Sequence, residues 1–440
     1  MRTVFRHGWV LTMDEDMHEY HPGYVVIQDD EIVDVGQDDV SRQFACDEEI
    51  DAHNCIIMPG MINCHSHISM IPFRSLGDDC KDRLRRFLFP LENACMTKQL
   101  AFTAAEYGSW EMLRGGITTF ADMYYFPDAV AGACERAGIR AFIGESVIDQ
   151  PTCDARDSEE GLRIAEQFIK HWKDHSLIRP MIALHATNTV SEKTFVKGMD
   201  IAMQNDVQLM CHVAEMDYEM DYFRNTYDMT PVEWLNAIHC LNDHLLAVHC
   251  IHLSVSDIEL MKQAGVSVAH CPGSNLKAGK GVSPVKDLVN EGVHVGLGTD
   301  GPSSGNTLEL FSLMRLVALA QKTYYHDRSL FPAKDIVKLA TIEGAKALHN
   351  EKVTGSLEKG KKADIITISL DAMHMFPVHD PYAALVYSAN ASDVKDVMVN
   401  GRMRIRNRQP EGIDVTKMKA ELTKLMEDFN KRAKEQADSL

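Results

Sequence analysis

The sequence has no long hydrophobic run and carries little positive charge for its length. No stretch of about 18 uncharged apolar residues occurs, so no segment is expected to span a membrane. The 45 lysines and arginines stand against 64 aspartates and glutamates, which gives a formal net charge of -19. A surface this acidic repels phosphate backbones and anionic lipids, so nucleic-acid and membrane partners are not expected. A neutral or cationic small-molecule substrate fits the charge better.

A signal peptide and a disulfide framework are also missing. Only five residues separate Gly8 from the acidic stretch Asp14–Asp16, which is too few for the apolar part of a secretory signal. The 11 cysteines are odd in number and scattered over 440 residues, a pattern typical of free thiols in a reducing compartment. We therefore expect a cytoplasmic protein. Four cysteines stand beside a histidine and are expected to be small buried residues instead of metal ligands: Cys64, Cys211, Cys250 and Cys271.

The two ends of the chain share a β-rich pattern that the middle lacks. Short β-type segments fill residues 1–57, and similar ones return in 351–410. In the second region Asn400-Gly401 is typical of the tight turn of a hairpin. Together the two ends predict one small β-sandwich domain.

The remaining tail, residues 411–440, predicts a helix over 413–437. Its apolar residues recur at intervals of three and four and so form one stripe, which indicates packing on the surface or on a neighbouring subunit. The stripe consists of Met418, Leu422, Leu425, Phe429 and Ala433.

The middle of the chain, residues 58–350, alternates short apolar β segments with stretches rich in helix formers. Eight β/α units in about 290 residues match a (β/α)8 barrel (TIM barrel), an α/β fold that usually takes about 250 residues. A doubly wound open sheet is the competing interpretation, but no glycine-rich phosphate loop follows the first β segment. The expected strands are Met58–Cys64, Thr118–Met123, Arg140–Glu145, Met181–Leu184, Gln208–Val213, Leu245–Cys250, Ser267–His270 and Val295–Thr299.

Histidines and one aspartate stand where these expected strands end. His65 and His67 are two residues apart, so both imidazoles lie on one face of a strand. Alone this pair is weak evidence, because two exposed loop histidines would explain it equally well. His212, His249 and Asp300 come at the ends of three later strands. Barrel active sites lie at this edge, so the five groups are expected to converge. Imidazole and carboxylate bind divalent metals, and the sequence therefore predicts a metal site.

The motifs that contain these residues resemble the amidohydrolase superfamily. More closely, the chain is similar to the triazine hydrolase and S-adenosylhomocysteine/methylthioadenosine deaminase branch, from about residue 3 to 405. The resemblance implies the barrel with a two-ended β-sandwich, and a metal held by three histidines and an aspartate: His65, His67, His212 and Asp300. The motifs are Pro59-Gly60-x-Ile62-Asn63-x-His65-x-His67, His212-x-Ala214-Glu215, His249-Cys250 and Gly298-Thr299-Asp300-Gly301.

A lysine is missing where two-metal relatives carry one. In those relatives a carboxylated lysine at the end of the fourth strand bridges the two ions, whereas here that end reads Ala183-Leu184-His185-Ala186-Thr187-Asn188. The resemblance therefore implies one divalent metal ion. Zinc (Zn2+) is the first choice for such a ligand set, and Fe2+ or Mn2+ would also accept nitrogen and oxygen ligands.

The resemblance also implies roles for the catalytic residues. Glu215 would take a proton from water and pass it to the substrate ring, and His249 would polarise the water or stabilise the intermediate's oxygen. Asp300, a base as well as a ligand, would carry a proton to departing ammonia. A surface glutamate on a helix turn is the alternative for Glu215.

Two further residues match substrate contacts of the relatives. Glu92 corresponds to a glutamate that binds ribose hydroxyls in nucleoside deaminases. Glu215, besides its acid–base role, is also expected to contact the substrate ring. His185 corresponds to a histidine that touches the ring. A solvated acid near a helix start is the alternative for Glu92, because the helix dipole favours acids there.

An arginine is missing after the third expected strand. Relatives that act on S-adenosylhomocysteine carry one there for the amino-acid end, whereas this chain reads Gly144-Glu145-Ser146-Val147-Ile148-Asp149. Residues 185–188 also depart from the family's pattern. A substrate that bears a carboxylate is therefore disfavoured.

The predicted function is hydrolytic deamination of an amino-substituted N-heterocycle, first of all an adenosine-type nucleoside or other aminopurine. The alternatives are an s-triazine or pterin aminohydrolase and a cyclic amide hydrolase. A non-catalytic scaffold is the remote alternative, which the intact set of candidate ligands disfavours. Relatives are commonly dimers or tetramers, so a homodimer or homotetramer is expected.

Overall fold

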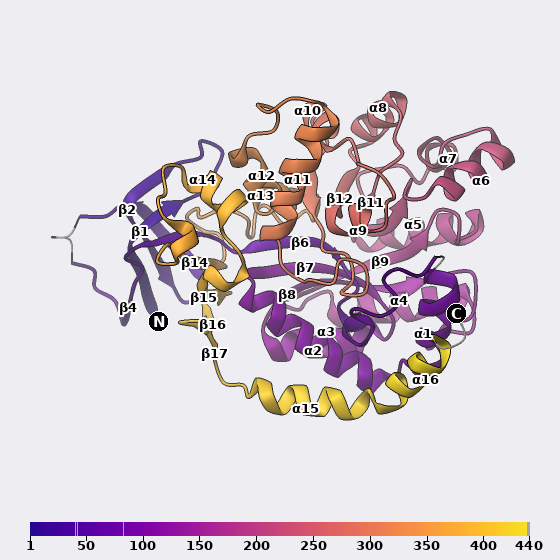
Figure 1. The fold of residues 1–440 in the computed structure, drawn as a ribbon, viewed down its shortest axis with the longest axis horizontal. Helices are drawn as coiled ribbons and strands as arrows, with labels where there is room; N and C mark the ends of the chain where they lie inside the picture. Colours follow the sequence, from indigo (N-terminus) through magenta and orange to yellow (C-terminus); the bar gives the residue numbers. More distant parts are fainter. Residues whose placement is uncertain (40, 42, 82, 438–440) are drawn as a thin grey trace.

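Eight parallel strands form a barrel at the centre of the computed structural model, which describes residues 1–437 except 40, 42 and 82 (Figure 1). Each strand hydrogen-bonds to the next in chain order, and each predicted strand overlaps an observed one. The predicted barrel is therefore confirmed. The strands are β6 (Met61–Ser66), β7 (Ile117–Tyr124), β8 (Arg140–Val147), β9 (Ile178–Ala186), β10 (Leu209–Val213), β11 (Leu245–His249), β12 (Ser267–His270) and β13 (Val295–Leu297).

The seam between the first and last strands closes through residues just beyond β13. Thr299 N donates to Asn63 Oδ1 at 2.9 Å, and Asn63 Nδ2 donates to Thr299 Oγ1 at 2.7 Å. The Asp300 N–H then donates to the His65 carbonyl at 3.1 Å. Closure of the barrel thus sets Asp300 beside His65, although the two residues are far apart in the sequence.

Helices cover the outside of the barrel (Figure 1). Several begin at a side chain that caps the first turn, as Thr97, Asp157 and Ser191 do by accepting a backbone N–H three residues on. They are α1 (Phe89–Cys95), α2 (Lys98–Arg114), α3 (Pro127–Ala137), α4 (Ser158–Trp172), α5 (Glu192–Asn205), α6 (Asp217–Tyr227), α7 (Pro231–Ala237), α8 (Val255–Ala264), α9 (Pro272–Lys277), α10 (Val285–Asn290), α11 (Phe311–Tyr324), α12 (Ala333–Leu339) and α13 (Ile342–Ala347). Short helical turns, Ile68–Phe73 and Leu84–Leu88, follow β6. In the part of the chain that the structure describes, no helix is long and apolar enough to cross a membrane.

A second, mixed sheet of nine strands lies beside the barrel and is built from both ends of the chain (Figure 1). The two ends meet where β5 pairs antiparallel with β14. The predicted small β domain is therefore confirmed. Its strands are β1 (Arg2–Leu11), β2 (Glu19–Gln28), β3 (Glu31–Gln37), β4 (Glu48–Asp51), β5 (Cys55–Pro59), β14 (Ile365–Ser369), β15 (Val394–Val399), β16 (Arg402–Arg406) and β17 (Gln409–Pro410); the short helix α14 (Pro381–Ala383) lies between β14 and β15.

The predicted strand Met58–Cys64 was wrong as a single element. Its first two residues end β5 in the outer sheet, where Pro59 pairs with Ile365, and Met61 starts β6 in the barrel. Gly60 makes the crossing, and a Cβ atom there would lie 2.1 Å from Thr118 Oγ1. Only glycine fits at that approach. Hydropathy alone cannot show that one apolar run passes from one sheet to another.

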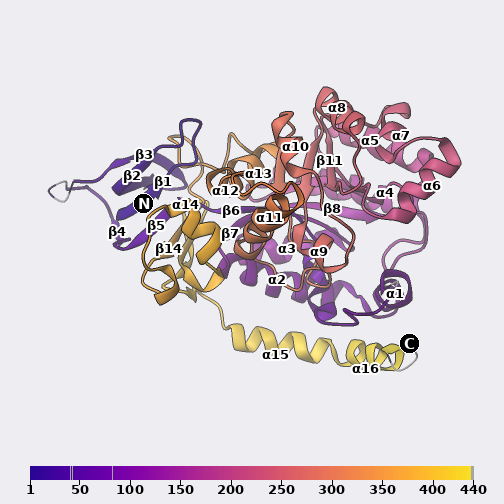
Figure 2. The ribbon, with the colours of Figure 1, turned by 45° about the horizontal axis from the view of Figure 1, so that its top comes forward.

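The carboxyl-terminal tail is helical as predicted, but it forms two helices, α15 (Val415–Leu425) and α16 (Glu427–Ala437). It runs along the outside of the barrel past α2 to α1 (Figure 2). Residues of the predicted stripe are buried, and the Phe429 ring packs at 4.7 Å from the Phe73 ring. The tail thus packs against the segment that carries Glu92.

Candidate metal centre and active site

Three imidazoles and a carboxylate meet at the carboxyl end of the barrel strands. His65 Nε2 lies 3.2 Å from His212 Nε2 and 3.7 Å from Asp300 Oδ1. His67 Nε2 lies 3.3 Å from the same oxygen. Ligand atoms about 2.1 Å from one tetrahedral zinc ion are about 3.4 Å apart, and these three separations are close to that value. The candidate ligand atoms form two groups that share His65, one with His67 and Asp300 and the other with His212 and His249. The residues therefore fit a divalent metal.

Hydrogen bonds to backbone groups orient these candidate ligands. His67 Nδ1 lies 2.6 Å from the Met123 carbonyl oxygen and donates to it, which turns Nε2 toward the cluster. Asp300 Oδ1 accepts the Gly301 N–H at 2.6 Å. Such outer partners fix the tautomer and direction of metal ligands. His249 Nε2 is also within 4.8 Å of the ligand atoms of His65 and His212, so it lies at the edge of the same cluster.

Burial sets the charge state of the cluster. Burial lowers the pKa of His65 and His212 well below the ordinary value, and neighbouring histidines lower it further. Burial raises the pKa of Asp300, but the hydrogen bond from His67 and the surrounding imidazoles hold it well below its usual range. His67 differs, because burial lowers its pKa but the hydrogen bond and the charge of Asp300 outweigh burial and raise the pKa to about 9. Neutral imidazoles and an ionised carboxylate are the forms in which these groups bind metal, so His67 would give up a proton on binding an ion.

Glu215 and His249 follow β10 and β11 and face each other. His249 Nε2 lies 3.4 Å from Glu215 Oε1, and His249 Nδ1 lies 2.8 Å from Asn275 Oδ1. Lys280 Nζ donates to the same Glu215 oxygen at 2.5 Å. Burial raises the pKa of Glu215, but His249 and Lys280 more than offset this and hold it below its ordinary value. Glu215 is a largely buried, ionised carboxylate beside the candidate metal ligands, and the alternative of a surface residue does not fit.

Glu92 and His185 lie at the side of this cluster. The Glu92 side chain is buried, which raises its pKa to about 7, while the neighbouring Tyr124 hydroxyl lowers it. The alternative of a solvated helix-start acid is therefore wrong. The His185 ring lies 5.3 Å from the His212 ring and 5.6 Å from the Phe89 ring, and burial lowers its pKa to about 4. Both residues are placed to contact a substrate next to the ligands.

Glu219 holds the turn that carries Glu215, and the sequence did not predict this role. It accepts the backbone N–H groups of Ala214 at 2.9 Å and Glu215 at 2.8 Å, and also the Thr187 hydroxyl. Burial raises its pKa to about 7, and these donors oppose the rise. A glutamate at the third position of a helix after a strand end was the available signal, since such residues reach back to cap the preceding backbone.

Replacing Glu219 with alanine should lower the free energy of unfolding by about 1–3 kcal/mol, because buried backbone donors lose their acceptor. Turnover should fall as well, since the turn below Glu215 is no longer held. Chemical denaturation and steady-state kinetics measure the two effects. Glu259→Ala, an exposed position on α8, is the matched control and should change neither. Equal stability of the two variants would contradict the role given to Glu219.

Known proteins resemble this chain along nearly its whole length. The amidohydrolase family matches residues 56–404. The chain belongs to the amidohydrolase family.

Curated relatives carry deaminase names. The 5-methylthioadenosine/S-adenosylhomocysteine deaminase of Syntrophobacter fumaroxidans is 38% identical over 405 residues, 91% of this chain and 92% of that protein. The 5'-deoxyadenosine deaminase of Methanosarcina mazei is 35% identical over 430 residues, 97% of this chain and 98% of that protein. A crystal structure of an adenosine deaminase from Xanthomonas campestris with bound zinc superimposes with a TM-score of 0.94 at 29% identity, covering 98% of both chains. The family predicted from the sequence motifs is confirmed.

This amidohydrolase carries acids where relatives that act on S-adenosylhomocysteine carry an arginine, a buried Glu145 and a half-buried Asp154. Glu145 is fully buried at the end of β8 beside Asp154. Burial and the neighbouring Asp154 raise the pKa of Glu145 well above its ordinary value. The Phe126 N–H donates to Asp154 Oδ2 at 2.6 Å, which ties the pair to the loop after β7. Glu145 lies on the same face of β8 as Ile143 and Val147, which pack in the helix layer, so residues 144–149 supply no cation and Glu145 packs outside the barrel interior.

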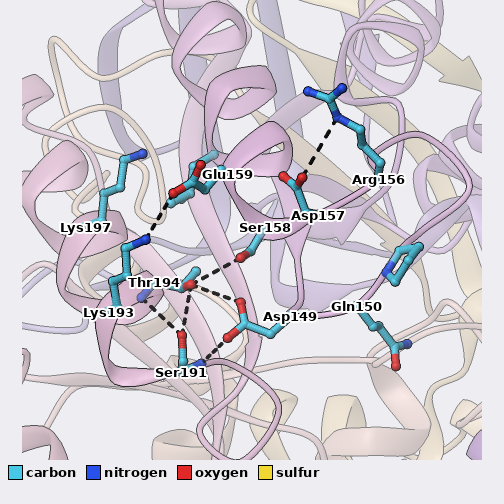
Figure 3. Close-up of a pocket in the computed structure, with 12 residues that line it drawn as sticks. Asp149, Gln150, Arg156, Asp157, Ser158, Glu159, Ser191, Lys193, Thr194 and Lys197 are labelled. Carbon is cyan, nitrogen blue, oxygen red and sulfur yellow. Dashed lines mark hydrogen bonds and ion pairs between the residues drawn. The ribbon is translucent and has the colours of Figure 1, made fainter.

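A cavity of about 330 Å³ lies away from the metal ligands, at the starts of α4 and α5 (Figure 3). Asp149 holds its two sides together, because Ser191 N donates to Asp149 Oδ2 at 2.6 Å and Thr194 Oγ1 donates to Oδ1 at 2.9 Å. Lys193 pairs with Glu159 across the opening. The polar groups satisfy one another, so this amidohydrolase uses them to join two helix starts.

The four histidine-adjacent cysteines behave as predicted. All are free and buried, and burial raises the pKa of each thiol. They are packing residues of the barrel.

Proposed function

We propose that this protein is a metal-dependent hydrolytic deaminase that releases ammonia from an adenosine-type nucleoside. The observation that carries the proposal is the buried cluster of His65, His67, His212 and Asp300 with the ionised Glu215 beside it. The deaminase relatives agree with the sequence-based prediction of an aminohydrolase. We further propose one zinc ion per chain, since imidazole and carboxylate groups suit zinc and a similar adenosine deaminase holds it. The homodimer or homotetramer and the cytoplasmic location expected from the sequence also stay proposals.

The residues of the site suit addition of water to a purine and loss of ammonia. When bound, the divalent ion supplies hydroxide at neutral pH by lowering the pKa of water to about 7. Glu215 would accept one proton of the water and deliver it to the ring nitrogen next to the amino-bearing carbon. Asp300 would take the second proton from the hydroxyl added to that carbon and deliver it to the departing amine, while His249, fixed by Asn275, would lie against the oxygen that remains. Water and the aminopurine are thus converted to ammonia and the oxopurine.

Glu92 and its neighbours suit the rest of a nucleoside. The buried carboxyl of Glu92 can accept hydrogen bonds from the vicinal hydroxyls of ribose, whose alternative partner, water, is excluded there. The Phe89 and His185 rings lie side by side and offer an apolar face to the base. These contacts favour a nucleoside over a bare ring such as an s-triazine.

The missing arginine after β8 suits a neutral substituent at the sugar's 5' position. S-adenosylhomocysteine carries a carboxylate at that end, and residues 144–149 offer it no cation. A hydrogen bond to a charged group contributes about 1.5–3 kcal/mol, so its loss costs roughly 10- to 100-fold in kcat/KM. Adenosine, 5'-deoxyadenosine and 5'-methylthioadenosine carry no such charge.

An ammonia-release assay across a substrate panel tests this function. We expect kcat/KM for the three neutral nucleosides to exceed that for S-adenosylhomocysteine by at least about 10-fold. Pterins, s-triazines and a cyclic amide complete the panel. Ammonia from a pterin or triazine alone would replace the nucleoside assignment, and ring opening of the amide without ammonia would overturn the deaminase assignment. A protein that binds no metal and turns over nothing would favour the scaffold alternative.

A further inference from the structure

Lys280 enters the active site from the loop between α9 and α10. Its Nζ donates to Glu215 Oε1 at 2.5 Å and to Ser274 Oγ at 3.3 Å, and its side chain is only 14% exposed. No other carboxylate among the described residues lies within ion-pair distance of Nζ. A lysine ammonium is seldom buried unless a partner compensates the lost hydration, so its place is set by Glu215.

The loop is shaped to deliver this lysine inward. Lys280 stands between Gly279 and Gly281, whose φ angles are +64° and +125°. Residues other than glycine rarely adopt this part of backbone space. The Lys280 N–H donates to the Asn275 carbonyl at 2.9 Å. Asn275 is also the residue that accepts from His249 Nδ1. One short segment therefore fixes both neighbours of the Glu215 carboxylate.

Both neighbours act on the same oxygen. Lys280 Nζ and His249 Nε2 lie against Glu215 Oε1, and among the described residues no hydrogen bond or ion pair reaches Oε2. The Glu215 backbone is held separately by Glu219. When one oxygen of a carboxylate is held by two partners, the carboxylate cannot rotate freely about its Cγ–Cδ bond. The other oxygen, Oε2, therefore points in one direction. Proton transfer needs such a defined position within hydrogen-bond reach of donor and acceptor.

We propose that Lys280 is a positioning residue for the acid–base glutamate. Its ammonium pins Oε1 of Glu215 and leaves Oε2 as the oxygen that takes the proton from water and passes it to the substrate ring. This inference rests on the proposed deaminase function, because Glu215 has an acid–base task only there.

Substitution of Lys280 by methionine, which keeps the length of the side chain, tests the proposal. We expect kcat to fall about 10- to 100-fold, as a misplaced catalytic group does, with KM and metal content nearly unchanged. Lys280→Arg should recover part of the loss, because a cation is restored at the same place. Lys262→Met is the matched control: Lys262 also pairs with one glutamate, Glu291 at 2.8 Å, but on the surface.

A double-mutant cycle separates positioning from a general structural effect. In a Glu215→Gln background, Lys280→Met should cost little further activity, because the group that it positions is already disabled. An equal loss in both backgrounds would overturn the proposal, and so would a raised KM with unchanged kcat, which would make Lys280 a substrate contact. Lys280→Gln serves in the same cycle if the methionine variant fails to fold.

Crystal structures of the ligand-free wild type and of Lys280→Met give a readout that needs no turnover. Glu215 Oε1 should lie against Lys280 in the wild type and should change its orientation in the variant. A wild-type Lys280 turned away from Glu215 would overturn the inference whatever the substrate is. A wild type with this contact that deaminates nothing would instead overturn the proposed function.

Discussion

Glu215→Gln is expected to retain its metal and to lose turnover by at least about two orders of magnitude. The amide fills the same space and can still accept from Lys280, but it cannot take up a proton and pass it on. The metal ligands are other residues, so their geometry should persist. Steady-state ammonia release together with metal analysis of the same sample measures both parts of the expectation.

The loss of turnover is expected because this carboxylate lies in the active site. Removing the charge of a surface glutamate should not produce it. Glu291→Gln is the control, because Glu291 also pairs with a lysine but lies on the surface. Its turnover should match that of the wild type. Near-normal activity of Glu215→Gln would reject the acid–base role, and loss of metal from it would show that Glu215 supports the ligand set directly.

The convergence of the candidate metal ligands could be predicted from the sequence because two simple rules act together. Alternation along a strand places His65 and His67 on one face, and parallel strands bring their carboxyl ends to one edge of the barrel. His212 and Asp300 each stand at the carboxyl end of a later strand, so they reach the same edge of the barrel. Local pattern therefore predicts convergence even though the chain between these residues is long.

The support of the site could not be predicted in the same way. Lys280 shows no periodicity that sets it apart from a surface residue, and it acquires its role only when its loop folds over Glu215. The burial of Glu92 likewise depends on the packing of Tyr124 and of the residues that cover α1. The break at Gly60 depends on which sheet each half of one apolar run joins. These three are tertiary effects, which short-range rules do not contain, whereas Glu219 follows a local capping pattern.

Barrel closure brings two candidate metal ligands together in this chain. Asn63 and Thr299 close the seam, and the neighbouring backbone bond from Asp300 to His65 is part of it. These two candidate ligands lie on opposite sides of the seam, so an ion between them would tie the first strand to the last. Binding energy of a metal that the unfolded chain cannot bind in the same way adds to folding stability.

Removal of the metal is accordingly expected to abolish turnover and to lower the unfolding temperature together. Saturation at about 1,000 times Kd stabilises a folded protein by about 4 kcal/mol, so a chelated sample should lose stabilisation of that order. Added zinc should restore both properties. Ammonia release and calorimetric unfolding of untreated, chelated and zinc-reconstituted protein measure them.

The ligand substitution His65→Ala should reproduce the chelated state and should not respond to zinc, because one of the four converging groups is gone. His171→Ala, an exposed histidine on α4, is the matched control and should bind zinc as the wild type does. Full turnover and an unchanged unfolding temperature after chelation would contradict the metal site itself. Loss of turnover without loss of stability would contradict only the link through the seam, since the ion would then serve the chemistry without joining β6 to the residues after β13.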